Sequence, residues 1–242
     1  MRLTFYILQL LSLMVCLFSE NYFGKEAKNA TEKAQLIVKQ NAVFLEGINQ
    51  LLVVFNETPE QDTAVLVAME KKGKKWKPVF EPMHAGTGRK GFAAPGAKRE
   101  GDQLSPSGFF RLGQLFCYEK KVDTRIPYIQ STAEDKWIDD PESTDYNQYV
   151  RGETHAKSYE KLLLTGNDYR YCMVIEYNTH PVVKGNGSAI FLHLSEGKVL
   201  NSSSGCIVQL QADMEQLLRW MRPELRPSIL MGNEHVLTIG LK

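Results

Sequence analysis

The chain has 242 residues, of which 43% are hydrophobic and 24% are charged, as in ordinary globular proteins. Lysine and arginine number 29 against 28 aspartates and glutamates, so the formal net charge is +1. This composition excludes collagen-like, low-complexity and wholly disordered chains, and the near-neutral charge provides no basic field for a nucleic-acid partner.

The first 19 residues, MRLTFYILQLLSLMVCLFS, have the pattern of an export signal. Arg2 is followed by 16 uncharged residues, Leu3 to Phe18, fewer than the roughly 20 apolar residues of a membrane-spanning helix. Leu17-Phe18-Ser19 lacks the Ala-x-Ala pattern of a cleavage site, so an uncleaved signal anchor is the alternative. We predict a signal peptide (or signal anchor) over residues 1–19 and export to the periplasm or cell envelope. Contact with the membrane is expected only if the signal is uncleaved.

Residues 20–47 are rich in Lys, Glu, Ala and Gln, and predict a helix that ends at Gly47 and is either a spacer or packed on the domain edge. One domain is expected over residues 48–242. Within it the patterns predict strands at 50–55, 64–70, 76–80, 171–177 and 189–194, and helices at 158–164 and 213–221. Residues 81–150 predict long ordered loops, and residues 229–231 with 236–239 predict a closing hairpin.

Three of the four cysteines remain once Cys16 of the signal is set aside, so at least one thiol has no partner within the chain. Cys117 and Cys172 are expected either to form a bridge or to be small buried residues. No H-E-x-x-H and no paired C-x-x-C occurs in the sequence. The G-x-G-x-x-G match at residues 86–91 lies between two prolines and outside any βαβ unit. We therefore expect no metal and no organic cofactor.

A histidine and a cysteine close in sequence carry the chemistry. His193 ends an apolar strand, and Cys206 follows the small residues 201–205 and precedes a second apolar run. If the two segments lie side by side, the imidazole can take the thiol proton, and an imidazolium would lower the thiol pKa. Gly205 allows close approach of the backbone, so the amides of Gly205 and Cys206 can hold an oxyanion. From spacing alone, a core histidine and a small buried cysteine are the alternative.

Two sets of motifs resemble one known family. The string from His193 to Ser203-Ser204-Gly205-Cys206-Ile207 resembles the catalytic motif of the L,D-transpeptidase (YkuD-type) family, a histidine, a loop and then [ST]-x-G-C before an apolar residue. Residues 98–110 are similar to the K-x-E-G-D-x-x-[ST]-P-x-G-x-F segment of one branch of that family. Tyr146-Asn147 and Tyr177-Asn178 match the Tyr-Asn pairs of the same branch. The resemblance covers roughly residues 50–240.

The resemblance implies a mainly β fold, an L,D-transpeptidase-like β-sandwich with short helices and long loops, preceded by an N-terminal helix. It implies peptidoglycan stem peptides as substrates, and a place in cell-wall organisation and cell shape. The Cys206 thiolate would attack the carbonyl before D-Ala of a stem tetrapeptide, and His193 would protonate the leaving D-Ala. Gly205 would contribute a backbone amide to the oxyanion hole, and a carbonyl such as that of Leu194 would fix the imidazole tautomer.

An amine of a neighbouring stem would then resolve the thioester and give a 3–3 crosslink. Water as the acceptor, giving an L,D-carboxypeptidase or hydrolase, is the first alternative. A non-catalytic cell-wall-binding module is the second.

The sequence departs from the family pattern at two positions. Many members have Gly directly after the histidine and Arg two positions after the cysteine, where this chain has Leu194 and Val208. The missing arginine leaves recognition of the substrate carboxylate open, and another cation is one alternative, because a guanidinium or ammonium can hold a carboxylate. The candidates for this role are Arg89, Lys98 and Arg99, which are otherwise solvated loop charges. Ser188, Ser203 and Ser204 are further candidate substrate-binding residues.

Overall fold

The computed structural model describes residues 25–241 of the chain. The export signal predicted over residues 1–19 lies outside the described residues. Within residues 25–241, no helix has the length and apolar character needed to cross a bilayer.

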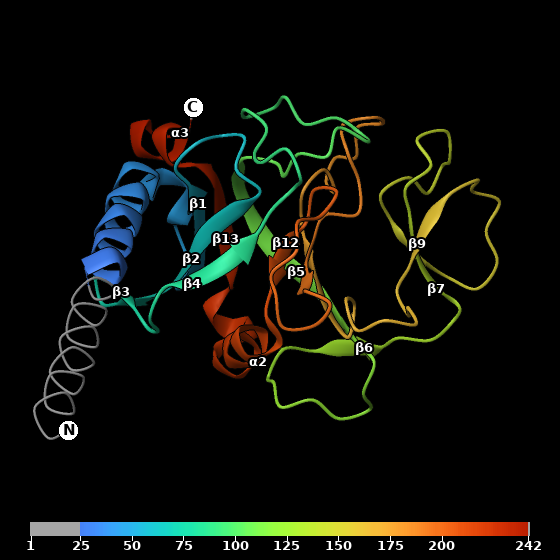
Figure 1. Ribbon diagram of the computed structural model, residues 1–242. Helices are drawn as coiled ribbons and strands as arrows, with labels where there is room; N and C mark the ends of the chain where they lie inside the picture. Colours follow the sequence, from blue (N-terminus) through green and yellow to red (C-terminus); the bar gives the residue numbers. More distant parts are fainter. Residues whose placement is uncertain (1–24, 242) are drawn as a thin grey trace, which may run out of the picture.

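A mixed sheet that closes on itself forms the body of the protein (Figure 1). Eight strands follow one another around the ring: β1 (Gln50–Asn56), β13 (Ser228–Asn233), β5 (Gly108–Cys117), β10 (Tyr171–Ile175), β11 (Phe191–Leu194), β12 (Ile207–Gln209), β4 (Met83–Gly86) and β2 (Thr63–Lys72), which pairs again with β1. β3 (Lys75–Pro78) extends the sheet beside β2, and β6 (Tyr128–Gln130) pairs with β5. The expected mainly β fold is confirmed. The two sheets of the expected sandwich are joined by hydrogen bonds at both edges, so the eight strands form a closed barrel.

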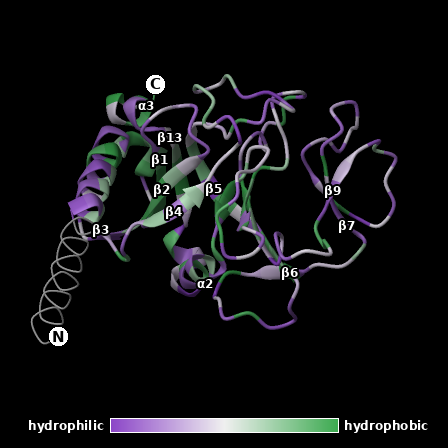
Figure 2. Ribbon diagram, viewed as in Figure 1, coloured by the Kyte–Doolittle hydropathy of each residue, from purple (hydrophilic) through white to green (hydrophobic). Residues whose placement is uncertain are grey.

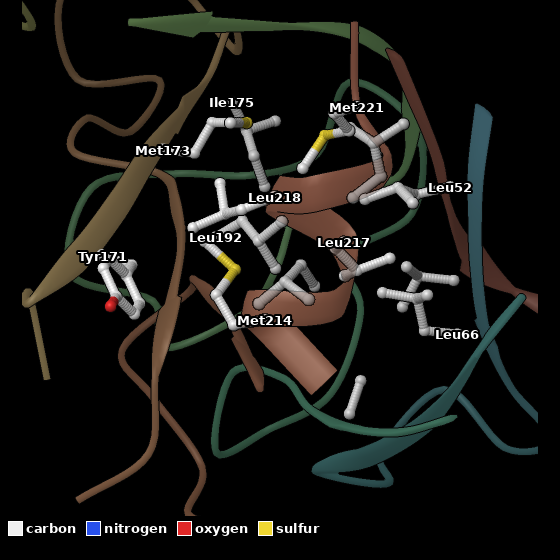
Figure 3. Close-up of a cluster of buried hydrophobic side chains, with 14 of the residues drawn as sticks. Leu52, Leu66, Tyr171, Met173, Ile175, Leu192, Met214, Leu217, Leu218 and Met221 are labelled. Carbon is white, nitrogen blue, oxygen red and sulfur yellow. The ribbon is translucent and has the colours of Figure 1, made fainter. Parts of the chain in front are cut away.

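The interior of this ring is filled by alternating apolar side chains and by one face of α2 (Gln211–Trp220). Leu52 of β1 and Leu192 of β11 point inward, as expected for every second residue of a strand. Met214, Leu217 and Leu218 of α2 have the i, i+3, i+4 spacing of one helical face, and they pack among these strand residues (Figure 3). The helix predicted at residues 213–221 is therefore confirmed.

The N-terminal helix covers the outer face of β1. Residues 25–40 are helical and are followed by the short helix η1 (Ala42–Leu45). Ala34 and Ile37 are fully buried against Leu51 and Val53, the outward-pointing residues of β1. In Figure 2 the green, apolar stripe of this helix faces the sheet. Of the two arrangements expected for residues 20–47, the described part adopts the packed one.

Two predicted elements are wrong, each because a local signal was outweighed, and residues 81–150, which were expected to form loops, also contain the ten-residue strand β5. Residues 158–164 do not form a helix: β9 (Tyr159–Lys161) pairs with β7 (Asp135–Ile138), which also pairs with β8 (Tyr149–Arg151) in a separate small sheet. The closing hairpin is replaced by η2 (Pro223–Leu225), β13 and then α3 (Glu234–Ile239). Asn233 starts α3, since its side-chain oxygen accepts the amide N–H of His235 at 3.1 Å.

Cys117 and Cys172 do not form a bridge and are small buried residues, the second of the two expected alternatives. Cys117 and Cys172 are both free, and neither is exposed to solvent. Burial raises the pKa of the Cys117 thiol to about 12, so this thiol is a small core residue that does not ionise near neutral pH.

Candidate active site

His193 lies in β11, and Cys206 directly precedes β12, the neighbouring parallel strand. In the register of β11 and β12, Leu192 is opposite Ile207 and His193 is opposite Val208. Leu192 and Ile207 point into the core, so alternation places His193 and Cys206 together on the outer side of the barrel. Both line a cavity of about 310 Å³. The structure therefore brings the two predicted residues to one site, through parallel strands rather than through a returning segment.

The His193 ring is fixed by the backbone and by an aromatic neighbour. Its Nδ1 lies 2.8 Å from the carbonyl oxygen of Leu194, so Nδ1 carries the proton and donates it there. The lone pair of Nε2 is then available as a base. The Tyr169 ring meets the imidazole edge-on, with ring centroids 5.1 Å apart. The expected role of Leu194 in fixing the tautomer is compatible with this contact.

Burial sets the charge of both groups. The side chain of His193 is only 8% exposed, and burial lowers its pKa to about 4, against the opposing effect of the Leu194 and Asp168 carbonyls. Burial also raises the pKa of the Cys206 thiol to about 12, although the Phe191 amide partly offsets it. Between these two pKa values both groups are neutral at rest, and within residues 25–241 no hydrogen bond joins the imidazole to the thiol. The imidazolium expected to lower the thiol pKa is therefore not the resting form.

The thiol has two backbone partners. The amide N–H of Phe191 donates to Cys206 Sγ at 3.3 Å, and the S–H group donates to the carbonyl oxygen of Ala189, also at 3.3 Å. Ala189 holds this carbonyl in place with a left-handed backbone, φ +52°. Such a conformation is uncommon for a residue with a side chain and is typical of constrained functional sites.

The Asn147 side chain stabilises the left-handed backbone conformation of Ala189 through hydrogen bonds. Its Oδ1 accepts the amide N–H of Ala189 at 3.1 Å and the indole N–H of Trp137 at 2.8 Å. Its Nδ2 donates to the carbonyls of Tyr177 and Asn178 at 3.1 and 2.7 Å. Both asparagines of the Tyr-Asn pairs have positive φ, 57° and 54°, which asparagine tolerates better than most residues. The sequence pointed to these pairs only through the family resemblance and gave no sign of their function.

Gly205 is required by its backbone and by its neighbours. Its φ is +151°, and a Cβ there would lie 3.0 Å from the Leu104 carbonyl oxygen and 3.2 Å from Ile190 Cδ1. The Gly205 amide N–H already donates to Ser203 Oγ at 3.0 Å. Within the described residues, no acceptor is found for the amide N–H of Cys206. Of the two amides expected to hold an oxyanion, that of Cys206 is therefore the unoccupied one.

The three candidate cations differ in position. Lys98 is 3% exposed, and its ammonium group donates to Asp102 Oδ1 at 2.5 Å and to the Arg99 carbonyl at 2.8 Å. Arg99 lies outside the cavity lining and donates to the carbonyls of Gly96 and Lys98. Arg89 lines the cavity, is exposed, and has no acidic partner among residues 25–241. It is thus the lining cation whose charge is not already paired.

The candidate serines also differ in their contacts. Ser188 lines the cavity and donates to Glu100 Oε2 at 2.7 Å. Ser203 donates to the Cys206 carbonyl at 2.8 Å, so it supports the loop that carries the thiol. Ser204 is exposed at the cavity lining. The remaining polar lining includes five carboxylates, namely Glu100, Asp139, Glu160, Asp168 and Glu196. In the described part of the chain, no three His, Cys, Asp or Glu side chains are grouped as metal ligands.

The profile of the YkuD family, the L,D-transpeptidase catalytic domain, matches residues 52–230. No curated protein matches the sequence. Among solved structures, the chain is similar to Bd1075 of Bdellovibrio bacteriovorus, with 15% identity over 76% of this chain and 47% of that one, and a TM-score of 0.43. It is also similar to the helical cell shape determining protein Pgp2 of Campylobacter jejuni, with 16% identity over 78% and 53%, and a TM-score of 0.44. The chain spans about half the length of these structures.

Proposed function

Because the chain belongs to the YkuD family of L,D-transpeptidase catalytic domains, which act on peptidoglycan stem peptides, we propose that it is a cysteine-dependent peptidoglycan L,D-transpeptidase. The observation that carries this proposal is that His193 of β11 and Cys206, directly before the adjacent strand β12, line one cavity, with the imidazole tautomer fixed by a carbonyl. We assign residues 48–242 to the catalytic domain. We further propose that an export signal over residues 1–19 and the segment of residues 20–47 precede it, and that the protein acts in the cell envelope.

The first half-reaction forms a thioester on Cys206. His193 Nε2 takes the thiol proton as Sγ attacks the carbonyl carbon that joins the third stem residue to D-Ala. The carbonyl oxygen becomes an oxyanion, to which the unoccupied Cys206 amide donates. The imidazolium then gives its proton to the nitrogen of D-Ala, the carbon–nitrogen bond breaks, and D-Ala leaves as a neutral amine.

The low pKa of His193 favours transfer of the proton from the imidazolium to the leaving amine. An imidazolium in a buried site is unfavourable, which is why burial lowers the His193 pKa to about 4. The proton that His193 takes from the thiol is therefore readily passed to the leaving amine, which is a much stronger base. The Leu194 carbonyl keeps Nδ1 protonated throughout, so that only Nε2 exchanges the proton.

The second half-reaction transfers the acyl group to an amine of a neighbouring stem and gives a 3–3 crosslink. His193 again acts as the base, now for the attacking amine, and the thiol is regenerated. In the donor stem, Arg89 is the residue that we assign to the substrate carboxylate, because the Lys98 ammonium is already paired with Asp102.

Product analysis with purified stem tetrapeptide muropeptides tests this function. Crosslinked dimers with released D-Ala are expected. Tripeptide alone would assign the protein as an L,D-carboxypeptidase, and unchanged substrate would contradict both. Cys206→Ala is expected to abolish turnover, whereas Ser158→Ala, at an exposed position outside the cavity lining, is expected to keep it. A Cys206→Ala protein that still binds sacculi would instead favour a wall-binding module if the wild type shows no turnover.

A further inference from the structure

Glu100 is a carboxylate built into the wall of the catalytic cavity. It lines the same cavity as Cys206 and His193, beside Ser188. One of its oxygens, Oε2, accepts the Tyr146 hydroxyl at 2.5 Å and the Ser188 hydroxyl at 2.7 Å. The Gly187 amide N–H in turn donates to the Tyr146 hydroxyl oxygen at 3.1 Å. The carboxylate is therefore held in one orientation by groups that are themselves fixed.

The other half of this carboxylate is available. Within residues 25–241, Glu100 Oε1 accepts no hydrogen bond, and Glu100 has no ion pair. The nearest lysine in sequence, Lys98, cannot neutralise it, because its ammonium is paired with Asp102 at 2.5 Å. A fixed, uncompensated carboxylate in a partly closed cavity is a strong acceptor for a cationic donor.

The surrounding charge has the same sign. Asp139 and Glu160 line the cavity as well, and neither forms an ion pair in the part of the chain that the structure describes. Burial raises the pKa of Glu160, and the charge of Asp139 raises it further, so these carboxylates lie close enough to interact. One oxygen of Asp139 is buried without a hydrogen-bond partner. This part of the cavity is therefore negative, in contrast to the exposed guanidinium of Arg89.

We propose that Glu100 is a specificity-determining residue that binds the side-chain ammonium group of the third residue in the acyl-donor stem. This proposal rests on the proposed function. The donor stem is the occupant because Ser188, which holds Glu100, directly precedes Ala189, whose carbonyl accepts the Cys206 thiol proton. The wall that carries Glu100 thus begins one residue from the hydrogen-bond acceptor of the thiol, and the proposal places the side chain of the acylating residue along this wall. The protein thus selects donor stems whose third residue carries an unmodified side-chain amine.

Acylation by three synthetic stem tetrapeptides tests the assignment. The peptides differ only at the side-chain amine of the third residue, which is free, dimethylated or acetylated, and the measurement is the rate of adduct formation on Cys206. The wild-type protein is expected to react about tenfold faster with the free amine than with the acetylated one, the effect of one charged hydrogen bond. The dimethylated peptide, which keeps its charge, is expected to react more like the free amine.

Glu100→Gln is the informative variant, because its carbonyl oxygen can still accept from Tyr146 and Ser188 while the charge is lost. It is expected to slow the free-amine peptide until its rate matches that of the acetylated one, whose own rate is unchanged. Glu153→Gln, an exposed carboxylate outside the cavity lining, is the matched control and keeps the preference.

Equal rates for all three peptides with the wild type, or an undiminished preference in Glu100→Gln, would overturn the role of Glu100 while leaving the proposed function intact. If none of the peptides acylates the wild type, the proposed function itself fails, and the assignment of Glu100 fails with it.

Discussion

The resting state of Cys206 can be tested without substrate, through the pH dependence of its alkylation by iodoacetamide. Burial raises the pKa of this thiol to about 12, whereas an unperturbed cysteine has a pKa of about 8.5. At pH 7 the thiolate fraction is then on the order of 10⁻⁵, against roughly 3% for the unperturbed thiol. Because only the thiolate reacts, alkylation of Cys206 is expected to be about three orders of magnitude slower than that of a free cysteine.

The shape of the profile decides between two resting states. For a neutral pair, the rate rises about tenfold per pH unit from pH 6 to beyond pH 10, and His193→Ala changes it little. A plateau between pH 5 and 8 that disappears in His193→Ala would refute the reasoning, because it would show a thiolate–imidazolium pair at rest. Peptide mapping by mass spectrometry assigns the modified residue, and the buried Cys117 and Cys172 report any unfolding.

Three further outcomes are expected. Since burial lowers the His193 pKa from 6.5 to about 4, the unfolded chain binds a proton below pH 6.5 that the folded chain does not, and about 3 kcal/mol of stability is lost as the pH falls from 6.5 to 4. Urea unfolding of wild type and His193→Gln measures this difference, and parallel pH curves would contradict it. Gly205→Ala is expected to cost about 1–3 kcal/mol of stability and to abolish acylation, whereas Gly185→Ala, with φ +78° and nothing within 4 Å of the added Cβ, is expected to keep acylation. Arg89→Gln is expected to raise KM for the donor stem about tenfold with little change in kcat, and an unchanged KM would exclude Arg89 as the carboxylate partner.

Strong periodic patterns were sufficient to predict much of the fold. The alternating runs at residues 50–55 and 64–70 correspond to β1 and β2, and the helical spacing of Met214, Leu217 and Leu218 corresponds to α2. In each case the apolar period matches the face that is buried, so the local signal and the tertiary packing agree.

Elements determined by distant partners could not be predicted in this way. Residues 159–161 form a strand by pairing with β7, which is distant in sequence. The local pattern of residues 158–164, which predicts a helix, contains no information about that partner. The sequence predicts a hairpin strand in place of α3 because Val236, Leu237 and Ile239 also suit a strand, whereas the helix depends on the Asn233 cap that precedes them. Closure of the sheet depends on β1 pairing with both β2 and β13, which lie at opposite ends of the domain sequence.

The sequence predicts the two central residues of the candidate site, His193 and Cys206, but not the residues that support them. His193 and Cys206 were identified because their types and spacing suit nucleophilic chemistry, and the strand register brings them to one cavity. The support that Asn147 gives to Ala189 depends on contacts 42 residues apart, which no local pattern shows. The sequence presents burial of the pair only as the alternative to a catalytic role, whereas the structure shows a buried pair that lines one cavity, and burial makes both groups neutral at rest.

The central claim is that Cys206 becomes acylated with His193 as its base, and direct detection of the adduct tests it. The protein is mixed with a stem tetrapeptide, quenched in acid within the first turnovers, and analysed by intact-mass spectrometry with peptide mapping. The expected result is a tripeptide acyl group on the peptide that contains Cys206, together with released D-Ala, and neither in His193→Ala. An adduct on another residue, or D-Ala release at the wild-type rate by Cys206→Ala, would contradict the account.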